Sequence, residues 1–210
     1  MTRAFLLAVT LLAFGVAAGG DPPAPAISRT EPTSTSSVSV DAKRQAPQFA
    51  LPDQFAETHE FRFPRDRVTV LTVADKKGSA QLDAWIQPLH DRYADRIHLD
   101  GLADMGGAPG PLRGIIRAAF RKQVAHPVML DWKGTTARAF DYERKQANVY
   151  VIDRSGRITH RVAGEMSGPG LEALHTAIDA ALKQPPPEAT PAVSDPPTIH
   201  GAAEPVALAR

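Results

Sequence analysis

Residues 126–162, HPVMLDWKGTTARAFDYERKQANVYVIDRSGRITHRV, contain the strongest fold signal in the chain. Near the end of this stretch, the apolar run 149–152 is followed by the turn-forming residues 153–156, and an apolar pattern resumes at Ile158. Two β-rich runs separated by such a turn predict a β-hairpin. Gly156 is expected to adopt the positive φ that this turn requires, because glycine has no Cβ to oppose it.

The order of the motifs resembles the C-terminal half of thioredoxin-like proteins, especially redoxins of the alkyl hydroperoxide reductase and thiol-specific antioxidant type. The motifs are Leu-Asp, Lys-Gly, Ala-x-Ala-Phe and Val-x-Val-Ile-Asp-x-x-Gly-x-Ile, within residues 130–158. With the preceding elements, the resemblance spans roughly residues 47–183. It implies an α/β fold, a thioredoxin-like three-layer α/β/α sandwich with a mixed central sheet.

The amino-terminal residues have the pattern of a secretory signal peptide. Arg3 precedes an apolar run, residues 4–18, that ends in the small residues suited to signal peptidase. An uncleaved membrane anchor is the alternative, but the run is shorter than the ~20 residues that a spanning helix needs. Gly19 stands where a lipoprotein would have cysteine, which excludes lipid attachment there. A signal peptide at 1–18 predicts a periplasmic or secreted protein.

The remaining chain divides into one domain and two flanking segments. Residues 19–46 are rich in Pro, Ser and Thr and predict a disordered linker, and residues 184–210 predict a disordered Pro-rich tail. Residues 47–183 are expected to form the redoxin-like domain, because a chain of 210 residues that is 43% hydrophobic can bury one sizeable core.

Within this domain, apolar spacing predicts the elements that surround the candidate site. Residues 68–73 predict a strand buried on both faces, and residues 97–102 predict a parallel neighbour. Ser79 is the expected N-cap of the intervening helix, which contains Pro88. Its expected buried face consists of Leu82, Trp85, Ile86, Leu89 and Tyr93. The next helix is expected to bury Leu112, Ile115, Ile116, Ala119 and Phe120, and the last to bury Leu171, Leu174, Ile178, Ala181 and Leu182.

The chain contains no cysteine. The resemblance implies a catalytic cysteine in the turn after the first core strand, which here reads Asp-Lys-Lys-Gly-Ser, residues 75–79. It also implies a cis-proline six positions before Asp153, where this chain has Ala147. Peroxiredoxins instead carry a Thr-x-x-Cys at this turn and an arginine near the cis-proline position, and this chain keeps neither arrangement. Because the thiolate is the required nucleophile, no thiol-dependent activity and no catalytic residue are predicted.

Two basic clusters are candidate binding sites. Lys76, Lys77, Gly78 and Ser79 lie at an expected helix start, where free N–H groups and the helix dipole favour an anion or an acidic partner. Arg113, Arg117 and Arg121 form a second basic surface at i, i+4, i+8. For both clusters the alternative is a solvated surface without further function. The seven histidines show no metal-ligand spacing, so neither a metal nor a cofactor is predicted; His59 is interpreted as a surface turn residue and Trp85 as core, whereas Trp132 is not assigned.

Three functions are compatible with these residues. The first is an exported thioredoxin-like binding or structural module of the cell envelope, with an unknown envelope protein or an acidic ligand as its partner. The second is a redoxin-class oxidoreductase or antioxidant protein, and the third is a small-ligand or anion binder that uses the vacated cleft. A net charge of +1 gives no reason to expect nucleic acid. Membrane association is expected only if the signal segment stays uncleaved.

Overall fold

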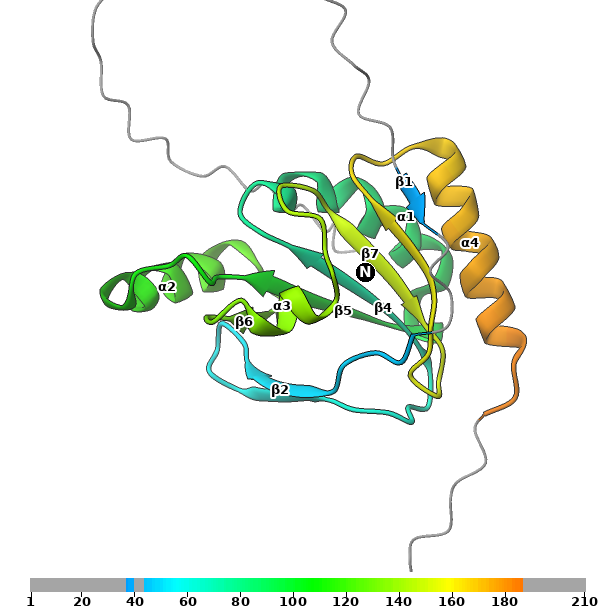
Figure 1. Cartoon of the computed structure of the whole chain (residues 1–210), viewed down its shortest axis with the longest axis horizontal. Coiled ribbons are helices and arrows are strands. Elements are labelled where there is room, and N and C mark those ends of the chain that lie inside the picture. The colour runs from blue at the N-terminus through cyan, green and yellow to red at the C-terminus, as the bar shows by residue number, and fades with distance from the viewer. Residues whose placement is uncertain (1–36, 40–43, 187–210) are drawn as a thin grey trace, which may run out of the picture.

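Strand β4, Val68–Ala74, lies in the middle of the main sheet, and all seven of its residues are buried. In this computed structural model, which describes residues 37–39 and 44–186, six strands form the sheet in the order β1-β8-β7-β4-β5-β6 (Figure 1). The other five are β1 Ser37–Ser39, β5 Ile97–Asp104, β6 Met129–Asp131, β7 Asn148–Ile152 and β8 Ile158–Ala163. A separate hairpin pairs β2, Phe49–Pro52, with β3, Thr58–Phe61.

The pairing confirms the mixed sheet. β4 runs parallel to β5 and antiparallel to β7, and β5 runs parallel to β6. β7 and β8 form the predicted antiparallel hairpin. Gly156 has a φ of 91° in its turn, where a Cβ would lie 2.7 Å from the Phe63 ring. The predicted requirement for glycine is therefore confirmed, for a packing reason as well as a conformational one.

Helices cover the two faces of the sheet unequally. α1, Leu82–Tyr93, and α4, Gly168–Lys183, pack on one face and bury Trp85, Tyr93 and Ile178 against β4 and β7. The other face is covered by the β2–β3 hairpin and by the short α3, Thr135–Ala139, around Phe61 and Phe140. α2, Arg113–Gln123, projects from the side of the sheet where β5 and β6 lie (Figure 1). Three short 3-10 helices complete the fold at Gly78–Gln81, Ala94–Arg96 and Gly110–Leu112.

Side-chain hydrogen bonds account for the start of α4 and for the position of Trp85 in α1. The Ser167 side chain accepts a hydrogen bond from Gly170 N and so caps the start of α4. Trp85 is fully buried, as predicted, and its indole N–H donates to the Gly164 carbonyl at 2.9 Å. Pro88 lies inside α1. The predicted cap at Ser79 is wrong, because the Ser79 hydroxyl donates to the Lys76 carbonyl and caps no N–H group.

The predicted linker contributes to the fold. β1 and Gln45 both lie within residues 19–46, yet β1 pairs with β8, and Gln45 forms a β-bridge with Arg157. Ordered structure therefore begins before Pro47, where the domain was predicted to start. The predicted signal peptide, the rest of the linker and residues 187–210 of the predicted tail lie outside the described residues. In the part of the chain that is described, no helix has the length and apolar character needed to span a membrane.

Candidate functional site

The turn after β4 is organised by the carboxylate of Asp75. Asp75 Oδ1 accepts hydrogen bonds from the backbone N–H groups of Lys77 and Gly78, at 3.0 and 2.9 Å. The Asp75 carbonyl accepts a third bond from Ser79 N at 2.9 Å. Aspartate bonds in this way to N–H groups two and three residues later because its side chain is short. Asp75 therefore caps the helical segment, in place of Ser79.

The same carboxylate joins this turn to the loop before β7. Asp75 Oδ2 accepts a hydrogen bond from Lys145 N at 2.9 Å, and Gln81 Oε1 accepts one from Ala147 N at 2.8 Å. Between these bonds the two backbones touch, because a Cβ at Gly78 would lie 2.1 Å from the Gln146 carbonyl oxygen. The turn and the loop are consequently closed against each other.

The electrostatics of Asp75 agree with a structural role. Burial raises the pKa of this carboxyl, but hydrogen bonds from Gly78, Lys145 and Lys77, together with the positive charge of Arg144, outweigh burial and leave the pKa below its ordinary value. Asp75 is therefore ionised at neutral pH, and its negative charge is directed at the helix start.

This geometry changes the basis of the predicted anion site. The N–H groups of Lys77, Gly78 and Ser79 already bond to Asp75, so they are not free to receive an anion. Gly78 is buried, whereas the Lys76 and Lys77 side chains are exposed. Anion binding at residues 76–79 stays a prediction, and it now depends on the two lysine ammonium groups alone.

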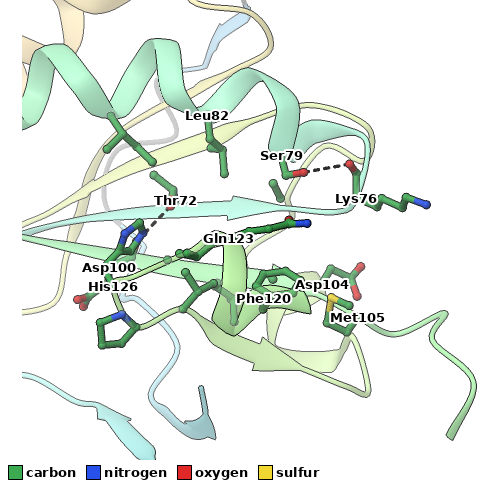
Figure 2. A pocket seen from close by; sticks show the side chains of 18 of the residues that line it. Thr72, Lys76, Ser79, Leu82, Asp100, Asp104, Met105, Phe120, Gln123 and His126 are labelled. Atoms are coloured by element: carbon green, nitrogen blue, oxygen red, sulfur yellow. Dashed lines mark hydrogen bonds between the residues drawn. The ribbon is translucent and has the colours of Figure 1, made fainter. Parts of the chain in front are cut away.

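A cavity of about 610 Å³ lies beside this turn, between α1, α2 and the sheet (Figure 2). Its floor is formed by residues of the neighbouring strands β4 and β5, including Thr72, Ala74, Leu99 and Gly101. The residues that line its sides are mainly apolar: Leu82, Ile86, Met105, Ile115, Ile116, Ala119, Phe120, Val124, Pro127 and Val128. A concave, largely apolar space of this size is typical of a small-molecule site.

The cavity exists because α2 stands off the sheet. None of the α2 residues is buried; Ile115 is 68% exposed, and Leu112, just before the helix, is 45% exposed. The prediction that α2 buries its apolar face is therefore wrong. Ile116, Ala119 and Phe120 are half-buried and line the cavity. Helical periodicity identifies an apolar face correctly, but it does not reveal whether another element of the fold covers that face.

The predicted basic stripe of α2 has a partner in Trp132. The Arg113 and Arg117 guanidinium carbons lie 5.5 and 5.9 Å from the Trp132 ring, at cation–π distance. Arg121 is exposed, and within the described residues it has no such contact with an aromatic ring. Two of the three arginines therefore hold α2 against the segment after β6, and Trp132, which sequence alone did not place, has a defined position.

His59 is not the surface turn residue that the sequence predicted. It lies in β3, and its Nε2 is 2.8 Å from Oδ2 of Asp53, which is fully buried. Asp53, Glu57 and His59 together offer three potential metal-ligand atoms within 4.8 Å, a grouping that the sequence analysis missed. Asp53 Oδ1 also accepts hydrogen bonds from the N–H groups of Phe55 and Glu57, so these bonds satisfy the carboxylate without an ion.

Solved structures resemble this chain across the described domain. A protein assigned as the thiol:disulfide interchange protein DsbE from Chlorobium tepidum matches with a TM-score of 0.53 and 22% sequence identity, covering 69% of this chain and 99% of its own. The chain has a thioredoxin-like fold. An uncharacterized conserved protein from Geobacillus kaustophilus matches with a TM-score of 0.53 and 18% sequence identity. The match covers 75% of this chain and 92% of that protein. A hypothetical protein from Sinorhizobium meliloti matches with a TM-score of 0.51 and 19% sequence identity. That match covers 71% of this chain and 88% of the other. No protein-family model and no curated protein matches the sequence.

The fold places two segments that the sequence analysis singled out next to each other. Residues 75–79 follow the central strand, and Ala147, at the position predicted for a cis-proline, bonds to Gln81 at the start of α1. Among the described residues the sole cis peptide bond is Phe63–Pro64, so Ala147 follows a trans bond. The chain thus combines this fold with a sequence that has no cysteine, and an aspartate fastens the turn after β4.

Proposed function

We propose that this chain is an exported binding domain that accommodates a small, largely apolar molecule in the cavity between α1, α2 and the sheet, and that it has no thiol redox activity. The observation that carries the proposal is the 610 Å³ cavity with its apolar lining beside the turn after β4. Export is supported by the signal-like pattern of residues 1–18.

Two features oppose the redoxin-class alternative. Thiol exchange and peroxide reduction both need a thiolate, and the sequence contains no cysteine. The side chain at the start of the turn is a carboxylate whose two oxygens accept hydrogen bonds from three backbone N–H groups, which is a structural role. The name of the DsbE relative refers to thiol:disulfide interchange, and the likeness to it supports the fold alone. The purified chain should therefore neither reduce insulin disulfides nor consume peroxide with thiol donors, and turnover at enzymatic rates would contradict the proposal.

Binding is tested with a neutral apolar dye. Nile red should become fluorescent on saturable binding to the parent chain, because the cavity removes the dye from water. Ala119→Trp places an indole into the cavity lining and should abolish most of this binding. Ala125→Trp is the matched control, since Ala125 is exposed just beyond α2 and does not line the cavity.

Folding of both variants is checked by their thermal unfolding midpoints. Equal dye binding by a folded Ala119→Trp variant and by the parent would contradict a site in this cavity. A parent chain that binds no dye would contradict the proposed function itself.

A further inference from the structure

The charged residues that line the cavity are predominantly acidic. They are four aspartates and one lysine: Asp75, Lys76, Asp83, Asp100 and Asp104. The lysine is exposed, and its side chain extends away from the other labelled residues in Figure 2. Three histidines, His59, His90 and His126, also line the cavity, and burial lowers the pKa of His126.

Three of the four carboxylates already have partners. Asp75 accepts the backbone bonds described above, Asp100 pairs with Arg65 at 2.6 Å, and Asp104 accepts from the Tyr142 hydroxyl and from Gly106 N. Asp83 differs from them: within the described part of the chain it has neither a hydrogen-bond donor nor an ion-pair partner. It lies in the first turn of α1, half-buried between the cavity-lining residues Leu82 and Ile86.

A half-buried carboxylate without a partner has lost part of its hydration, and no hydrogen-bond donor of the protein replaces it. Burial raises the pKa of Asp83, and no other influence opposes it. A ligand that brought a positive charge to this carboxylate would replace the lost hydration with a charge-assisted hydrogen bond. An anionic ligand would meet repulsion from Asp83 and from the other three carboxylates.

We infer that the ligand of this cavity is a cationic amphiphile, an apolar body carrying a protonated amine whose ammonium group pairs with Asp83. This inference rests on the proposed function and specifies its ligand class. The apolar body would lie against Leu99, Ile116 and Phe120, all of which line the cavity.

Three compounds with one skeleton and different charges test the inference: phenylbutylamine, phenylbutanol and phenylbutyrate. Their dissociation constants at pH 7 are obtained from amide chemical-shift titrations, which measure weak binding. The parent chain should bind the amine about tenfold more tightly than the alcohol, the effect of one charge-assisted hydrogen bond, and the acid more weakly than either.

Asp83→Asn removes the charge and keeps the shape, so it should reduce amine affinity to that of the alcohol. Asp91→Asn removes the same charge from an exposed position of α1 outside the cavity and should leave the preference for the amine unchanged. Equal affinity of the parent for amine and alcohol, or tightest binding of the acid, would overturn the inference and leave the proposed function standing. Absence of binding by all three compounds would overturn both.

Discussion

The Asp75 carboxylate accepts a 2.9 Å hydrogen bond from the backbone N–H of Lys145, 70 residues later in the chain. This bond, with those from Lys77 and Gly78, fastens the turn after β4 to the loop before β7. Asp75→Ala would leave three backbone donors without their acceptor. We expect it to lower the free energy of unfolding by about 1–3 kcal/mol in urea denaturation, the range for a lost cap or unsatisfied group. Asp91→Ala, at an exposed position of α1, is the control, and it should change the free energy of unfolding by less than about 0.5 kcal/mol.

The close approach of Gly78 to Gln146 gives a second prediction. Gly78→Ala would place a methyl group 2.1 Å from a backbone oxygen, so the turn and the loop would have to separate. We expect a loss of several kcal/mol of unfolding free energy, of the order seen for severe core disruption. Gly114→Ala serves as the comparison, because nothing lies within 4 Å of its added Cβ and it lies inside α2. Alanine there should stabilise by about 0.5–1 kcal/mol. Equal effects of the two substitutions would contradict the packing described.

The stacking of Arg113 and Arg117 on Trp132 predicts the behaviour of α2. Trp132→Leu removes both cation–π contacts, each contributing about 0.5–2 kcal/mol. Amide hydrogen exchange should then become faster in residues 113–123, while protection of β4 and β7 is little changed. Arg121→Gln, which alters the arginine without such a contact, should leave exchange in α2 as in the parent. Unchanged protection of α2 in Trp132→Leu would show that these contacts do not hold the helix.

Burial of His160 predicts a dependence of stability on pH. Burial lowers the pKa of His160 in the folded protein, and its Nε2 is buried without a partner among the described residues. In the unfolded chain the histidine pKa is about 6.5, so at pH values near and below 6.5 the unfolded chain binds more protons at this residue than the folded protein does. The contribution of neutral His160 to the free energy of unfolding should be fully present above a pH of about 6.5 and should be lost as the pH falls below that value. Unfolding free energies of the parent and of His160→Leu, measured across this range, should show a shallower slope in the variant. Identical slopes would rule out this contribution.

Much of the architecture was predictable because its determinants are local. The fully apolar β4, the turn with Gly156 and the amphipathic α4 each carry their signal within a few residues. The cap at Ser79 was predicted wrongly because the helical segment already begins at Gly78, and Asp75, four residues before Ser79, satisfies the N–H groups at its start. No local pattern shows which of the two side chains prevails.

The candidate site was mostly beyond sequence reasoning, because it depends on where elements stand relative to each other. The apolar face of α2 was identified from its spacing, but the gap between it and β5 has no counterpart in the sequence. The sequence analysis did not single out Asp83, because its lack of a partner among the described residues depends on which side chains surround it in the fold. The contact of Trp132 with α2 likewise joins separate parts of the chain.

The location of ligand binding tests the central claim most directly. Backbone amide shifts of the full chain are followed during titration with the neutral phenylbutanol. We predict saturable shifts concentrated in residues that line the cavity, such as Leu99, Gly101, Ile116 and Phe120, with little change in the hairpin around Gly156. Saturable shifts confined to other surfaces, or no saturable shifts at all, would contradict the assignment of this cavity as the binding site.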